Sequence, residues 1–215
     1  MALYQEKVEL VKESLLEMLQ VAEYSIAYKK AESEKWGSSA KGILGYPAAV
    51  LLFSIIDCMG SVFVGDTNMS ISIDGNHHSI KNTSQHIFIL NSKYFKFGLS
   101  KKDLNNIYSN FRSTLTHNSL MPKGYILQVG EGERRPFKIA INEFDNRIYF
   151  LNLIPLLEVT KKAVINFMDD LDKGNIDFEE TKLHKNIEKR DLRTTIYYNT
   201  EQIGLYQRIK RWIIE

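Results

Sequence analysis

Apolar residues recur at helical spacing in four segments of the chain, and these predict its long elements. The four segments are residues 3–35, 43–64, 104–121 and 153–171. Residues 82–97 fit both a helical and a strand period, so the pattern alone leaves their structure open. Helices of this kind are stable when they bury their apolar sides against one another. The pattern therefore predicts a mainly α protein built as a helical bundle.

Three β-rich runs interrupt the helical pattern between residues 124 and 152. They are residues 125–129, 137–141 and 148–151. The last two predict a hairpin, because turn-forming residues separate them at 143–147. We expect a small antiparallel sheet inserted before the last helix. A loop over residues 65–81 holds one further short strand, at residues 69–73.

The most hydrophobic stretch, residues 43–64, is long enough to raise a transmembrane interpretation. Gly45 and Pro47 interrupt its start, Asp57 would be costly in lipid, and no cluster of basic residues flanks it. We therefore interpret this stretch as the central helix of the bundle, apolar nearly all round.

The polar residues of this central helix form one narrow stripe, because they are spaced i, i+3 and i+7. They are Ser54, Asp57 and Ser61. An ionised Asp57 in a core needs a partner, since an unpaired buried charge is very unfavourable. Arg112 is the first candidate for that partner and His117 the second. The alternative is that Asp57 reaches solvent at an incompletely covered face.

The composition is that of a soluble globular protein, with 44% hydrophobic and 25% charged residues. A chain of 215 residues can bury one substantial core, so we expect one domain over residues 1–175 and a charged extension over 176–215. The net charge of +2 neither demands nor excludes nucleic acid. One cysteine permits no internal disulfide and favours a cytoplasmic setting, and the first residues show no secretory signal.

The histidines and the cysteine do not predict a metal site or a cofactor. His77, His78 and His86 fit no standard zinc spacing, and we interpret them as surface residues. Cys58 lies in the most apolar stretch, where a thiol is usually an inert small hydrophobe. We therefore expect no bound metal and no cofactor.

Residues 104–121 hold the most informative chemistry. Ser100 and Asp103 predict the start of this helix, and its apolar stripe is Leu104, Ile107, Phe111 and Leu115. Arg112 and His117 would stand roughly 140° apart around an α-helix. They border a polar face that also carries Asn105, Ser109 and Thr116. The long arginine side chain could still meet His117 at one bound group, because the helix ends near Asn118.

An arginine, four residues and a histidine near the end of a helix, after the aromatic pair Tyr108 and Phe111, resemble the motif of the HEPN superfamily. These are helical domains that include many RNases. The resemblance extends over about residues 3–172 and implies a HEPN-like bundle in which residues 82–97 form a short third helix. In catalytic members the residue after the arginine is often Asn, Asp or His, whereas this chain has Ser113.

The resemblance implies a metal-independent endoribonuclease in which Arg112 binds the phosphate and His117 acts as acid and base. Asp57, Ser109 and Ser113 would support them. Acid and base must stand on opposite sides of the phosphorus, and HEPN RNases typically share the site between two subunits, so a homodimer acting on single-stranded RNA is implied. A toxin or defence role, with a protein antitoxin or regulator as a further partner, belongs to the same interpretation.

Two other interpretations stay open. In the first, the chain is a non-catalytic HEPN-like module that binds RNA, a nucleotide or a protein. In the second, Arg112 and His117 have structural roles only. In the second case Arg112 pairs with Asp57, and His117 interacts with the dipole at the end of its helix.

The charged C-terminal extension carries two basic clusters diluted by acidic residues, which is a weak nucleic-acid signature. We expect it to dock on the bundle or on a second subunit, because it also holds large apolar side chains. They include Tyr197, Tyr198, Leu205, Tyr206, Trp212 and Ile213.

Overall fold

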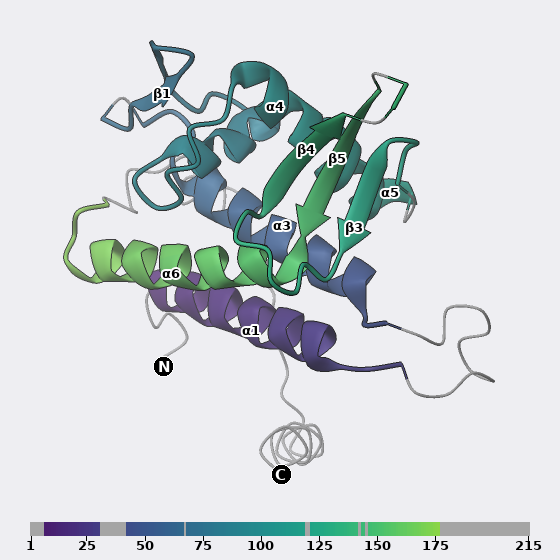
Figure 1. The fold of residues 1–215 in the computed structure, drawn as a ribbon. Coiled ribbons are helices and arrows are strands. Elements are labelled where there is room, and N and C mark those ends of the chain that lie inside the picture. The colour runs from purple at the N-terminus through teal and green to yellow at the C-terminus, as the bar shows by residue number, and fades with distance from the viewer. Residues whose placement is uncertain are drawn as a thin grey trace, which may run out of the picture.

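Two long helices form one layer of the protein. The computed structural model describes residues 7–30, 42–66, 68–118, 121–141, 143–144 and 146–176. Helices α1 (Lys7–Ala27) and α6 (Leu153–Asp172) lie side by side and run in opposite directions (Figure 1). Two ion pairs join them: Lys12 Nζ is 2.7 Å from Asp172 Oδ1, and Lys161 Nζ is 2.6 Å from Glu23 Oε1.

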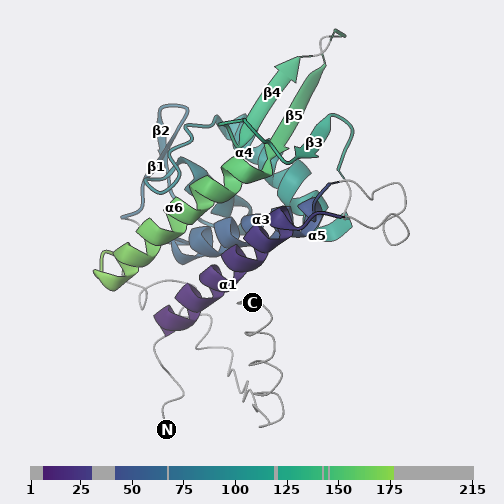
Figure 2. The same ribbon diagram turned by 60° about the horizontal axis from the view of Figure 1, so that its bottom comes forward.

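Helix α3 (Gly45–Val62) packs on this layer and forms the centre of the core (Figure 2). By length and composition it is the one helix of the described residues that could cross a membrane, but half of its span is buried within the fold. The core helix of a soluble protein has the same properties. The prediction of a central helix is confirmed, and its buried residues are Ala48, Ala49, Leu52, Phe53, Ile55, Ile56, Met59, Gly60 and Val62.

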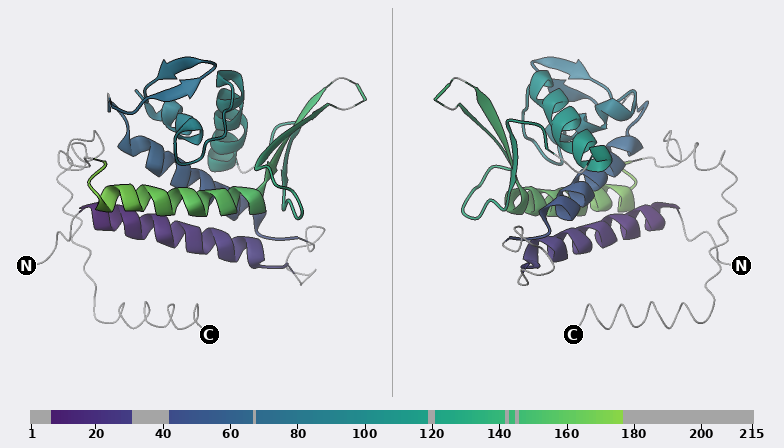
Figure 3. Two further views of the ribbon diagram at one scale, coloured as in Figure 1. Left: turned by 60° about the vertical axis from the view of Figure 1, so that its left-hand side comes forward. Right: turned by 90° about the vertical axis from the view of Figure 1, so that its right-hand side faces the viewer.

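One continuous helix, which we call the motif helix, lies on the other side of α3 from α1 (Figure 3). It comprises α4 (Lys101–Asn106), the π-helical segment η3 (Ile107–Ser113) and α5 (Thr114–Asn118). The predicted start is confirmed, because the hydroxyl of Ser100 accepts a hydrogen bond from the main-chain N–H of Asp103. The predicted apolar stripe is also confirmed, since Leu104, Ile107, Phe111 and Leu115 are buried.

The chain between α3 and the motif helix holds a short hairpin and a 3₁₀-helix. The hairpin pairs β1 (Ile71–Ile73) with β2 (Asn76–His78), and η2 (Thr83–Asn91) packs against α3. Strand β1 was predicted and β2 was not. Asp74 and Gly75 between them both have positive φ, which is the two-residue turn that an Asp-Gly sequence favours.

The second sheet has the strand order β3-β5-β4 and packs beside the motif helix (Figure 1). Strands β4 (Phe137–Ile141) and β5 (Arg147–Asn152) form the predicted antiparallel hairpin. Strand β3 (Tyr125–Gln128) pairs with β5 in parallel, so the prediction of a purely antiparallel sheet is wrong. The reason is the connection over residues 129–136, which crosses the end of β5 and is held there by a hydrogen bond from Asn152 Nδ2 to the carbonyl oxygen of Arg135.

These elements make a mainly α protein with two small sheets. The buried apolar side chains of the described residues form one continuous core. Parts of the sequence predictions lie outside the described residues. These parts are residues 3–6 and 31–35 of the predicted first helix and residues 177–215 of the predicted extension.

Candidate functional site

Of the three residues in the predicted polar stripe of α3, Asp57 is the one whose side chain bonds to another helix. The other two members of the predicted polar stripe bind within α3: the hydroxyl of Ser54 donates to the carbonyl oxygen of Val50, and that of Ser61 donates to Cys58. Asp57 is therefore the one residue of the stripe that remains to bind another element, and it lies on the side of α3 that faces the motif helix.

Arg112 of the motif helix binds this carboxylate, which confirms the first of the two partners predicted for Asp57. Arg112 Nε donates to Asp57 Oδ2 over 2.6 Å, and the two side chains are 19% and 16% exposed. A charge-assisted hydrogen bond of this kind offsets part of the free energy lost when both ions leave water. Asp57 Oδ1 is buried and has no hydrogen-bond partner among the described residues. Burial raises the pKa of Asp57, and the positive charge of Arg112 opposes that rise.

The guanidinium of Arg112 is oriented from a second side by an aromatic ring. Its central carbon lies 5.3 Å from the ring centroid of Tyr108, one turn earlier in the motif helix. Of the three guanidinium nitrogens of Arg112, only Nε makes a hydrogen bond to another described residue. The two terminal nitrogens of Arg112 are therefore available as donors to a bound anion.

Arg112 lies in the last turn of the π-helical segment, which the sequence did not predict. A π-helix is wound more widely than an α-helix, with main-chain hydrogen bonds from i to i+5. The Thr114 hydroxyl bonds the main-chain oxygen of Asn110, and the Thr116 hydroxyl donates to that of Arg112 over 2.7 Å. These threonines therefore satisfy carbonyl groups at the end of the wide segment. π-Helical turns occur frequently at functional sites.

The sheet covers one side of the motif helix. Asn106 Nδ2 donates to the hydroxyl of Tyr149 over 3.3 Å, and Asn110 Nδ2 donates to that of Tyr125 over 3.0 Å. The two tyrosine rings stack on each other with their centroids 4.9 Å apart. Asn106 and Asn110 therefore belong to a structural contact and not to an open binding surface.

The predicted polar face on the other side is open. Asn105, Ser109, Thr116 and His117 are exposed, and Ser113 is half-buried. No hydrogen bond among the described residues joins His117 to Arg112 or to Asp57. The structure thus brings Asp57 and Arg112 together, and it places His117 one turn further along the motif helix, in contact with solvent.

His86 is a member of this region that the sequence interpretation missed. It lies on η2 with 9% of its surface exposed, so the interpretation of all three histidines as surface residues is wrong for His86. Burial lowers its pKa, while the charges of Asp57 and Arg112 act on it in opposite directions. The signal in the sequence was Gly60, one turn after Asp57, because a methyl group on Gly60 would lie 2.4 Å from the main-chain oxygen of His86. Only glycine allows η2 to approach α3 this closely.

Metal chemistry has no evident ligand set in the described residues. No group of three or more His, Cys, Asp or Glu side chains is placed there to hold a metal ion. Cys58 is half-buried, and burial raises its pKa to about 11, so its thiol is protonated near neutral pH.

No protein-family model matches this chain, and neither a curated protein nor a solved structure matches it. The function must therefore be inferred from the residues of this chain alone.

Proposed function

We propose that the protein is a metal-independent, cytoplasmic endoribonuclease of the HEPN type, in which Arg112 binds the scissile phosphate and His117 transfers protons. The observation that carries the proposal is the ion pair between Asp57 and Arg112. It holds an arginine at the border of an open polar face, on the helix that also carries an exposed histidine. It also leaves the terminal nitrogens of Arg112 free to bind phosphate oxygens.

The reaction needs only side chains of these types. The 2′-hydroxyl of the RNA loses its proton to a base as its oxygen attacks phosphorus. The bond from phosphorus to the 5′-oxygen then breaks, and an acid gives that oxygen a proton. Histidine exchanges protons near neutral pH, and arginine stabilises the added negative charge on the phosphorane. The products are a 2′,3′-cyclic phosphate and a 5′-hydroxyl.

Two copies of the chain are part of the proposal. The base and the acid act on opposite sides of the phosphorus, and the motif supplies one histidine per chain. A two-fold dimer with the open faces of two motif helices toward each other would supply both. Exposure of Asn105, Ser109 and Thr116 in the single chain supports this arrangement, because a face reserved for a partner and for RNA must be uncovered in the monomer.

A second function is favoured by one observation. Arg112 is already bound to a carboxylate and its side chain is only 19% exposed, which suits an arginine that stabilises the fold. In that case the protein is a HEPN-like module that binds RNA, a nucleotide or a protein partner such as an antitoxin without cleaving RNA.

The two functions are separated by incubating the full chain with single-stranded RNA in the presence of EDTA. If the nuclease proposal is correct, the wild type cleaves the RNA and leaves 2′,3′-cyclic phosphate ends. His117→Ala should then lower the rate by about 10²- to 10⁴-fold, which is the usual contribution of proton transfer. Arg112→Lys should also lower the rate, because lysine keeps the charge beside Asp57 but lacks the planar fork.

Matched controls use residues of the same type away from the motif helix. His77→Ala on β2 and Arg147→Ala on β5 replace exposed side chains and should retain full activity. Circular dichroism checks that Arg112→Lys is folded. If the wild type shifts RNA on a gel and leaves it intact, the binding module is correct. If it neither binds nor cleaves RNA, both RNA functions are wrong.

A further inference from the structure

The outward face of α1 carries an apolar stripe. Leu10, Val21 and Tyr24 are 56%, 49% and 53% exposed, and positions 10, 21 and 24 fall within about 60° of one another around an α-helix. The opposite face of α1, with Leu15, Leu19 and Ala22, is buried in the core. Large apolar side chains gathered in this way on a surface helix indicate a contact with another segment.

The same face is acidic. Glu13 and Glu17 are exposed between the apolar residues. The only cation between Val8 and Ala27 is Lys12, and its ammonium group is held by Glu9 and Asp172. A partner for this face should therefore offer apolar side chains together with positive charge.

Residues 203–214 of this chain have that chemistry. Ile203, Tyr206, Ile209 and Ile213 recur every three or four positions, as on one side of a helix, and the charged residues of the segment are Arg208, Lys210 and Arg211. We infer that residues 203–214 bind to the outward face of α1 in the same molecule.

The path of the chain favours its own tail over that of a second copy. Asp172, at the end of α6, is bonded to Lys12 near the start of α1, so α6 ends next to α1, on the side of α1 that faces away from the apolar stripe. From Lys12 to Tyr24 the axis of α1 extends about 18 Å. A flexible connection the length of residues 177–202 spans about 28 Å, which is enough to reach any point of α1. Tethering at that distance gives an effective concentration in the millimolar range.

The inference is independent of the proposed RNase function. Helix α1 and the motif helix lie on different sides of α3 (Figure 3), so a tail bound to α1 leaves the candidate site uncovered. The test below uses no RNA, and its failure would leave the nuclease proposal unaffected.

Trp212 provides the test, because it lies within residues 203–214 and the chain has only one other tryptophan, Trp36. In full-length protein with Trp36→Phe, Trp212 should show blue-shifted emission and weak quenching by acrylamide. Adding Val21→Lys or Glu17→Lys should shift the emission to the red and increase quenching. Both sites are exposed, so neither change should unfold the bundle. The matched control is Ile141→Lys on β4, which replaces an apolar residue with 67% exposure and should leave Trp212 unchanged.

Salt and concentration complete the test. Protection of Trp212 should weaken as salt is added, because charge attraction contributes, and it should not depend on protein concentration. Emission typical of an exposed indole in the parent protein would overturn the inference. Protection that survives both α1 substitutions would do the same. Protection that rises with concentration, together with a doubled mass, would assign the face to a second copy.

Discussion

Asp57 and His86 are two titratable residues that burial holds toward their neutral forms. Burial raises the pKa of Asp57, with Arg112 opposing the rise, and burial lowers the pKa of His86. Asp57 is nevertheless paired with a permanent cation at 2.6 Å. Protonation of His86 would place a second positive charge near that of Arg112, in a region with little water. The region is therefore best suited to a neutral His86, and protonation of His86 should weaken the fold.

Protonation of His86 should make the stability of the fold depend on pH. Because the pKa of His86 is lowered in the folded state, the unfolded chain binds the proton first as the pH falls below 6.5. The free energy of unfolding should therefore decrease below pH 6.5, by at most about 1.4 kcal/mol per pH unit for one proton. His86→Gln cannot take up this proton and should show a flatter dependence. Urea unfolding at a series of pH values measures the slope.

His77→Gln is the control for this measurement, because His77 is exposed on β2. Its slope should match that of the wild type. Equal slopes for His86→Gln and the wild type would show that His86 does not contribute.

The raised pKa of Asp57 acts in the opposite direction. Its carboxyl group keeps a proton to higher pH in the folded state than in the unfolded chain, so the stability that this proton contributes is lost as the pH rises through the pKa of Asp57 in the folded state.

At the scale of single residues, the sequence was informative where a side chain had few ways to be satisfied. A carboxylate in a nearly continuous apolar helix requires a cation, and Arg112 was the first candidate for that reason. His86 offered no such constraint. Its burial depends on the approach of η2 to α3 at Gly60, which is a contact between distant segments.

Helix α3 and η2 approach each other closely at Gly60, and Gly60→Ala tests what this contact contributes. The added methyl group would lie 2.4 Å from the oxygen and 2.8 Å from the Cα of His86, which are main-chain atoms, so η2 must move. We expect a loss of about 1–3 kcal/mol of unfolding free energy, as for other overpacked cores. The higher helix propensity of alanine recovers up to about 1 kcal/mol of this. Urea unfolding measures the difference.

Gly45→Ala, in the first turn of the same helix, is a matched substitution. The nearest atoms to a methyl group there are all in side chains, those of Leu127 and Leu153 at 3.4 Å and that of Ile43 at 4.0 Å, and these can adjust. Gly45→Ala should therefore leave stability unchanged or slightly increased. If both variants lost the same stability, close approach to η2 would not be the cause.

At the scale of elements, the hydrophobic pattern predicted α1, α3 and α6 because each of these helices buries one side in the core. The hydrophobic periodicity could not predict two features of these elements. The π-helical segment keeps Ile107 and Phe111 buried, as an α-helix would, so its apolar pattern does not reveal the wider winding. The parallel pairing of β3 with β5 depends on where the chain crosses after Gln128 and not on any pattern within the strands.

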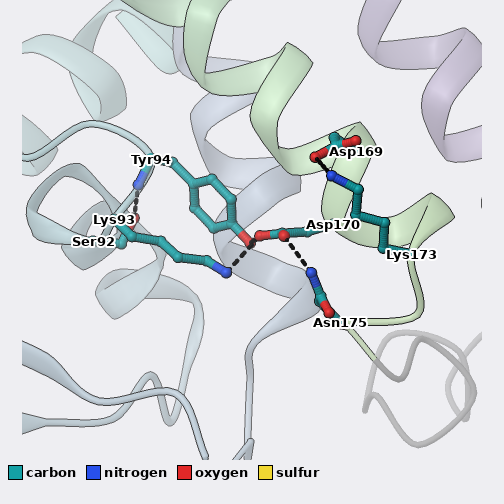
Figure 4. Close-up of polar contacts among 7 residues, drawn as sticks. All are labelled: Ser92, Lys93, Tyr94, Asp169, Asp170, Lys173 and Asn175. Carbon is teal, nitrogen blue, oxygen red and sulfur yellow. Dashed lines mark hydrogen bonds and ion pairs between the residues drawn. The ribbon is translucent and has the colours of Figure 1, made fainter.

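At the scale of the whole molecule, polar contacts at the end of α6 connect this helix to the segment after η2. Asp170 accepts hydrogen bonds from the hydroxyl of Tyr94 at 2.9 Å and from Asn175 Nδ2 at 2.8 Å, and Lys93 Nζ lies 2.5 Å from it (Figure 4). Lys93 and Tyr94 follow η2, so this carboxylate joins the last helix to the segment that carries His86. The same contacts also hold Asn175, directly after α6, against the end of that helix.

Asp170→Asn should open this connection. Burial acts to raise the pKa of Asp170, but the hydrogen bonds from Lys93, Asn175 and Tyr94 outweigh burial and lower it to about 2. The carboxylate therefore stabilises the fold at pH values above its ordinary pKa of 3.8, and this contribution is lost as the pH falls from 3.8 toward 2. Near neutral pH we expect Asp170→Asn to lower the unfolding free energy by about 1.5–3 kcal/mol, the range for hydrogen bonds to a charged group.

The neighbouring residue makes the test specific. Among the described residues Asp169, which is 54% exposed, pairs only with Lys173 one turn away, so Asp169→Asn removes the same charge from the same helix without touching η2 (Figure 4). An exposed pair of this kind contributes less than about 1 kcal/mol. Urea unfolding should therefore separate the two variants near neutral pH, and the gap should close as the pH approaches 2. A gap that stayed constant with pH would mean that Asp170 stabilises α6 by packing and not by its charge.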